Sequence, residues 1–154
     1  ADAIVEQFGA RVVFVPMQCP EDFAAAKKIV ERTTQEVHVL TEEYSTYELL
    51  SLVGNLDMLI GIRLHALIFA AVMHVPLAGI SYDPKIDRFL ECLGEQPVGT
   101  LKSITVETLI ATVQTLLAES KRPNRPWEER MNGLHEKAFR SAELALELIG
   151  KRQR

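Results

Sequence analysis

The chain has 154 residues, of which 47% are hydrophobic and 25% are charged, a composition that excludes a disordered protein and suits one domain with a buried core. Seventeen Lys and Arg against twenty-one Asp and Glu give a net charge of −4, which argues against a nucleic-acid partner. The two cysteines, Cys19 and Cys92, follow no disulfide or zinc-ligand spacing, so we expect a reducing, cytoplasmic environment.

Short apolar segments alternate with helical patterns along residues 1–120. Helices are expected at 1–8, 21–32, 46–53, 63–74, 84–93 and 105–119. Strands are expected at 11–16, 36–40, 57–61, 76–80 and 96–99. Several of these strands are almost entirely apolar, as in a parallel sheet buried on both faces. The alternation predicts an α/β fold, a Rossmann-like parallel sheet flanked by helices.

Residues 121–154 have a different composition. They hold nine basic and five acidic side chains, whereas residues 1–120 hold eight and sixteen. We expect a basic linker and then a long C-terminal helix with one apolar stripe: Trp127, Met131, Leu134, Ala138, Ala142, Ala145 and Ile149. This helix is expected to pack on the domain or to cross to another domain. Peripheral contact of the basic segment with a membrane is the alternative.

Ligands of open α/β sheets bind beyond the carboxyl ends of the strands. The loops expected there contain no dinucleotide-binding, P-loop or nucleophile-elbow motif. His65 and His74 are nine residues apart and would lie on different faces of a helix, so we predict no metal site.

Cationic groups follow two successive strands. Gly61 would let a ligand approach the backbone, and Arg63 offers a planar fork for a carboxylate or phosphate. His65 could bind an anion or move a proton, in a helix turn whose N–H groups favour anions. Lys85 opens the next helix, after Tyr82 and Asp83. Together these groups suggest a small ligand with two negative charges.

Each residue also has a structural alternative. His65 could be a buried histidine bonded to a backbone carbonyl, Arg63 could form an interdomain salt bridge, and Lys85 could be a solvated surface lysine. Asp83 could serve only to stabilise the turn before Pro84. Taken alone, the residues therefore predict an anion-binding α/β domain.

Residues 57–94 resemble the signature region of the polysaccharide pyruvyl transferase family, most closely its bacterial cell-wall, CsaB-type members. The matching motifs are an apolar strand ending at Gly61, then Arg63-Leu64-His65-Ala66, Pro76 and Tyr82-Asp83-Pro84-Lys85. The spacing from His65 to Lys85, 85 − 65 = 20, also agrees with the family pattern. The resemblance is weaker over residues 12–53 and rests on helix pattern alone after residue 101.

This resemblance implies a two-domain enzyme of glycosyltransferase-B-like fold, of which the chain would be the C-terminal half. Such enzymes transfer the enolpyruvyl part of phosphoenolpyruvate to two hydroxyls of a sugar, forming a pyruvate ketal and releasing phosphate, without a cofactor. In CsaB-type members the acceptor is an N-acetylmannosamine of a lipid-linked cell-wall precursor, and the ketal anchors S-layer proteins. A cytoplasmic location, or one at the inner face of the membrane, is implied.

The resemblance also assigns roles to residues. His65 and Lys85 fall at phosphoenolpyruvate-binding positions of the family. We hypothesise that His65 contacts the phosphate and serves as acid or base, and that Lys85 neutralises the departing phosphate. Arg63 is expected to orient an anionic group of the substrate or to brace the loop. Gly61, Tyr82 and Asp83 are expected to bind substrate as well. The N-terminal half would be a required partner, so we expect little activity from this chain alone.

Two rival functions stay open at this point. One is a sugar-nucleotide-dependent glycosyltransferase of the same fold, with a diphosphate at the helix after Gly61. The other is a non-catalytic interaction domain that uses the apolar helix after Arg63 to contact a partner. The residues do not indicate an oligomeric state.

Overall fold

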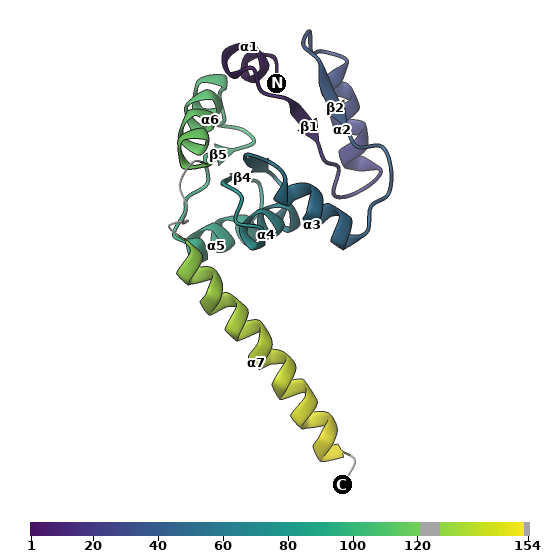
Figure 1. The fold of residues 1–154 in the computed structure, drawn as a ribbon, viewed down its shortest axis with the longest axis vertical. Helices are drawn as coiled ribbons and strands as arrows, with labels where there is room; N and C mark the ends of the chain where they lie inside the picture. Colours follow the sequence, from purple (N-terminus) through teal and green to yellow (C-terminus); the bar gives the residue numbers. More distant parts are fainter. Residues whose placement is uncertain (121–126, 153–154) are drawn as a thin grey trace.

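A computed structural model describes residues 1–120 and 127–152, without the side chains of residues 150–152 (Figure 1). The helices are α1 (Asp2–Phe8), α2 (Glu21–Val30), α3 (Thr46–Gly54), α4 (Leu64–Val72), α5 (Pro84–Leu93), α6 (Val106–Ser120) and α7 (Glu128–Arg152). The strands are β1 (Val12–Phe14), β2 (Val37–Val39), β3 (Leu59–Gly61), β4 (Leu77–Ser81) and β5 (Gly99–Thr100). The predicted α/β class, with parallel strands, flanking helices and a long C-terminal helix, is confirmed.

The strands form two parallel sheets within the described residues, not one continuous sheet. β1 pairs with β2, whereas β3, β4 and β5 form a second sheet with β4 in the middle. In the second sheet Gly61 lies opposite Gly79, so β3 and β4 end at the same edge. Both strands of the β1–β2 pair are only partly buried, while β4 is buried at four of its five positions. The hydrophobic driving force therefore concentrates on the second sheet.

The core lies where α4 and α5 cover β3 and β4. Leu67 and Ile86 are completely buried there, and Leu90 is 1% exposed. A Cβ on Gly79 would lie 2.7 Å from Leu90 Cδ1 and 3.2 Å from Leu67 Cδ1. Glycine at this position lets both helices approach β4 closely, which explains the tight packing of the sheet and its helices.

Several helix ends follow the sequence signals. Ser45 and Glu48 form a capping box at the start of α3, and Asp83 caps α5 by accepting the Lys85 N–H. Gly94, at φ 77°, ends α5 in the left-handed conformation that favours glycine. In contrast, no side-chain hydrogen bond caps α4, whose N-cap residue is Arg63.

Helix α7 begins in the core and then leaves it. Trp127, immediately before α7, is 2% exposed, and Met131 and Leu134 pack against the core cluster. Beyond them α7 extends away from the sheets (Figure 1). Phe139 and Ile149, on this part of α7, are exposed. The first positions of the predicted stripe are thus covered, and what contacts the remainder stays a prediction. The predicted basic linker, 121–126, lies outside the described residues.

We expect Leu67→Ala to lower the free energy of unfolding by about 2–5 kcal/mol, because it leaves a cavity where α4 meets β4. Urea denaturation measures this loss. The control is Leu101→Ala, at a leucine that is 57% exposed, which should change stability by less than about 0.5 kcal/mol. Equal effects of the two substitutions would contradict the position of the core.

Candidate functional site

Arg63 and Tyr82 meet where β3 and β4 end. Arg63 Nη1 lies 3.4 Å from the Tyr82 hydroxyl oxygen, and Arg63 Cζ lies 6.0 Å from the centre of the Tyr82 ring. Lys85 Nζ is 5.8 Å from the same ring centre. Parallel pairing thus brings together three of the predicted site residues, from two strand–helix junctions, with Arg63 Cζ and Lys85 Nζ both within 6.0 Å of the centre of the Tyr82 ring. At such distances a cation is attracted to the ring face.

Arg63 is also held by a carboxylate from a third element. Its Nη2 donates to Asp22 Oδ1 at 2.6 Å, and its Nε lies 3.1 Å from both oxygens of Asp22. Asp22 is in the first turn of α2 and also accepts the backbone N–H groups of Met17 and Gln18. Arg63 does form a salt bridge, but with Asp22 of this chain and not with another domain as the alternative had it. Substrate binding by Arg63 stays a prediction.

The ionisation of Asp22 follows from these contacts. Burial by itself raises the pKa of Asp22, but hydrogen bonds from Arg63, Gln18 and Met17 outweigh burial and lower the pKa below its ordinary 3.8. The hydrogen bond to Asp22 also raises the pKa of Arg63 further above its already high value. Both groups are therefore charged over the whole physiological pH range.

His65 lies in the first turn of α4 and is exposed. The alternative of a buried histidine is wrong, because Ala66 and Leu67 take the buried face of this turn and His65 faces outward. Since no side chain caps α4, its first N–H groups can donate hydrogen bonds to an anion.

Asp83 and Lys85 interact with each other. The Lys85 N–H donates to Asp83 Oδ1 at 2.9 Å, and Lys85 Nζ lies 3.6 Å from Asp83 Oδ2. The backbone hydrogen bond from Lys85 is the main cause of the lowered pKa of Asp83. The turn-stabilising role considered for Asp83 is thus present. The Lys85 side chain is 50% exposed, so its amine can reach a ligand as well as solvent.

Gly61 is buried, and packing accounts for it. A Cβ at Gly61 would lie 3.1 Å from both Leu59 Cδ2 and Leu67 Cδ2. A larger residue would therefore require both leucine side chains to shift by a few tenths of an ångström, which favours glycine at this position. Close approach of a ligand to the Gly61 backbone stays a prediction.

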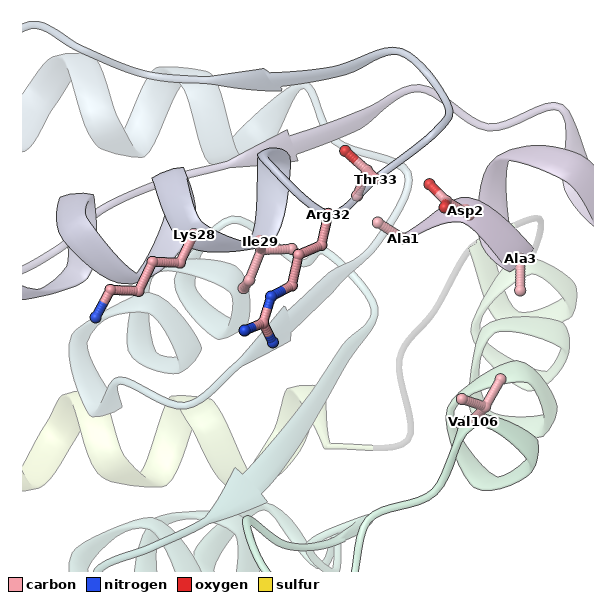
Figure 2. A pocket seen from close by; sticks show the side chains of 8 residues that line it. All are labelled: Ala1, Asp2, Ala3, Lys28, Ile29, Arg32, Thr33 and Val106. Carbon is pink, nitrogen blue, oxygen red and sulfur yellow. The ribbon is translucent and has the colours of Figure 1, made fainter.

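Two cavities lie away from these residues. One of about 490 Å³ is lined by the start of α1, by Lys28 at the C-terminal end of α2, by Arg32 just after α2, and by Val106 (Figure 2). The other, of about 290 Å³, lies between β4 and α6 and includes Glu95 and Glu119. Neither contains a predicted site residue. The predicted residues instead form an open edge, with His65, Tyr82 and Lys85 exposed.

Asp22 is the residue that the sequence reasoning did not select. A local signal does point to it, because residues 17–20 are one of the loops expected at the carboxyl edge and Asp22 lies in the first turn of the helix that follows. Within the described residues, no cluster of three His, Cys, Asp or Glu side chains is arranged to hold a metal ion. No helix in the same part of the chain has the length and apolarity needed to cross a membrane.

Fold and site together define a parallel α/β protein with cationic side chains at the carboxyl edge of neighbouring strands. The family model for polysaccharide pyruvyl transferase matches residues 1–84, and the chain belongs to this family, as the sequence motifs predict. The matched segment includes Asp22, Arg63, His65 and Tyr82, and Lys85 is the first residue after it. Neither a curated protein nor a solved structure matches the chain.

Asp22→Asn should destabilise the protein by about 1–3 kcal/mol at pH 7, because it removes the charged partner of Arg63. Folding lowers the pKa of Asp22. The contribution of Asp22 to the free energy of unfolding is therefore complete above the ordinary carboxyl pKa, and it is lost as the pH falls through the pKa of Asp22 in the folded protein. The stability difference between wild type and Asp22→Asn should thus narrow below about pH 4. Urea denaturation of both proteins from pH 7 to pH 3 measures this stability difference. A difference that widens as the pH falls would contradict the ion pair of Asp22 with Arg63.

Proposed function

We propose that the chain forms the phosphoenolpyruvate-binding half of a CsaB-type pyruvyltransferase. In this proposal the enzyme makes a pyruvate ketal on a sugar of a cell-wall polysaccharide precursor. The observation that carries the proposal is the grouping of Arg63 and Lys85 around Tyr82. Arg63 is also the N-cap residue of α4, whose uncapped first turn contains the exposed His65. The family match adds the class of reaction, because its members are pyruvyl transferases.

The charges at this edge suit phosphoenolpyruvate. The substrate carries a carboxylate and a phosphate, and the edge offers a guanidinium, an ammonium and free helix N–H groups. In the proposed pose, Arg63 orients one anionic group with its Nη1 side, while its other side stays on Asp22. Lys85 has the freedom to follow the phosphate, because its contact with Asp83 is long and exposed.

The chemistry needs a proton donor and a stable leaving group. The methylene carbon of phosphoenolpyruvate gains a proton, a sugar hydroxyl adds to the adjacent carbon, and the bond from that carbon to the phosphate oxygen breaks. A second hydroxyl then completes the ketal. Of the two hydroxyl protons, one ends on the new methyl group and the other on the released phosphate. His65 is the proposed acid or base, since an imidazole exchanges protons near neutral pH. Lys85 neutralises the departing phosphate.

The acceptor and the remaining parts of the site belong to the same proposal. We assign the acceptor as an N-acetylmannosamine of a lipid-linked precursor, contacted by an N-terminal domain that closes the other side of the site. We further propose a cytoplasmic location, where the lipid-linked acceptor would be met at the inner face of the membrane. The exposure of His65, Tyr82 and Lys85 supports this part of the proposal, because catalysis of this kind requires water to be excluded from the reacting carbon.

His65→Gln in the full-length protein should lower turnover by roughly 10²–10⁴-fold, because it removes the group that moves the proton. The measurement is phosphate release from phosphoenolpyruvate in the presence of the acceptor. The matched control is His38→Gln, on β2 with a side chain that is 54% exposed, which should leave turnover unchanged. Unchanged turnover in His65→Gln would remove His65 from the mechanism.

A further inference from the structure

Asp22 has contacts that exceed the needs of a helix start. Its side chain is only 15% exposed, and its two oxygens accept from Arg63 and from two backbone N–H groups, at Met17 and Gln18. Met17 and Gln18 follow β1, and Arg63 follows β3. One carboxylate on α2 thus ties together the ends of strands that belong to separate sheets.

The contact between Asp22 and Arg63 fixes the orientation of the guanidinium. A guanidinium is planar and donates in a rigid fork. Asp22 occupies the Nε and Nη2 side of this fork, so the Nη1 side is turned toward the Tyr82 hydroxyl at 3.4 Å. Because the backbone N–H groups of Met17 and Gln18 hold Asp22 itself, the guanidinium cannot turn without breaking several hydrogen bonds.

The ion pair of Lys85 with Asp83 can be compared with that of Arg63 with Asp22. Its amine lies 3.6 Å from Asp83 in a pair whose side chains are 50% and 38% exposed. Arg63 and Asp22, at 25% and 15%, are more buried and in closer contact. Of the two cations at this edge, Arg63 is therefore the one that is preorganised before a ligand arrives, and preorganisation lowers the entropic cost of binding.

We propose that Asp22 is a positioning residue for phosphoenolpyruvate, acting through Arg63. It holds the guanidinium so that Nη1 faces an anionic group of the substrate between β3 and β4. Asp22 does not touch the substrate, because its oxygens are used by Arg63, Met17 and Gln18. This inference rests on the proposed function, since it assumes that phosphoenolpyruvate binds at this edge.

The consequence is specific to substrate binding. Without Asp22, Arg63 keeps its charge but loses its fixed orientation, so the Michaelis constant for phosphoenolpyruvate should rise more than the turnover number falls. If Asp22 acts only through Arg63, its removal should have no further effect once Arg63 is gone.

A double-mutant cycle in the full-length protein tests this, using steady-state kinetics with phosphoenolpyruvate as the varied substrate. Asp22→Asn should raise KM by about tenfold and change kcat by less than about threefold. Arg63→Ala should raise KM at least as much, and the double variant should match Arg63→Ala alone. Glu21→Gln, the adjacent exposed acid in the same turn of α2, is the control and should leave KM unchanged.

The outcomes distinguish failure of the positioning role of Asp22 from failure of the proposed function. An unchanged KM in Asp22→Asn, or an Asp22→Asn effect that persists in full on the Arg63→Ala background, would overturn the positioning role. Thermal melting of each variant shows whether it folds. If Asp22→Asn folds poorly, Asp22→Glu replaces it in the test. Asp22→Glu keeps the charge on a longer side chain, so its rise in KM should be smaller than that expected for Asp22→Asn. If the wild-type protein neither binds nor turns over phosphoenolpyruvate, the proposed function itself fails, and the positioning role fails with it.

Discussion

The parallel pairing of β3 with β4 is the constraint on which the candidate site depends. With Gly61 opposite Gly79, the two strands end at one edge, and the residues that follow them come within reach of each other. Leu67 of α4 packs against both strands, because its side chain fills the space left by both glycines. A shift of one residue in this register would move every side chain of one strand to the opposite face and would separate Arg63 from Tyr82.

The edge is not a simple positive patch. Each of its two cations has a carboxylate beside it, Asp22 for Arg63 and Asp83 for Lys85. These four charges cancel, so attraction for an anion comes from how the groups are directed and from the free N–H groups at the start of α4. The two pairs differ in strength. The exposed pair of Lys85 can open to a ligand at little cost, whereas the more buried pair of Arg63 is retained.

Much of this arrangement could be predicted from local sequence signals. The order of strands and helices, the Ser45 capping box and the start of α5 at Pro84 follow from periodicity and from residues that satisfy helix ends. The grouping of Arg63 and Lys85 follows because parallel strands in βαβ units end at one edge. These predictions depend on neighbours in the chain or on a general rule of topology.

The features that could not be predicted depend on contacts between distant residues. Arg63 and Asp22 are 41 positions apart, and no local pattern indicates that they meet. The outward direction of His65 depends on which face of an almost wholly apolar helix the core covers, and periodicity cannot decide this for α4. The division of the strands into two sheets is likewise a matter of long-range packing.

The most direct test of the central claim is a crystal structure of the full-length protein with phosphoenolpyruvate bound. The account predicts that the ligand lies at the carboxyl ends of β3 and β4, with its phosphate near His65 and Lys85 and Arg63 still paired with Asp22. A ligand bound elsewhere, with none of these three cationic or titratable side chains in contact with it, would contradict the account.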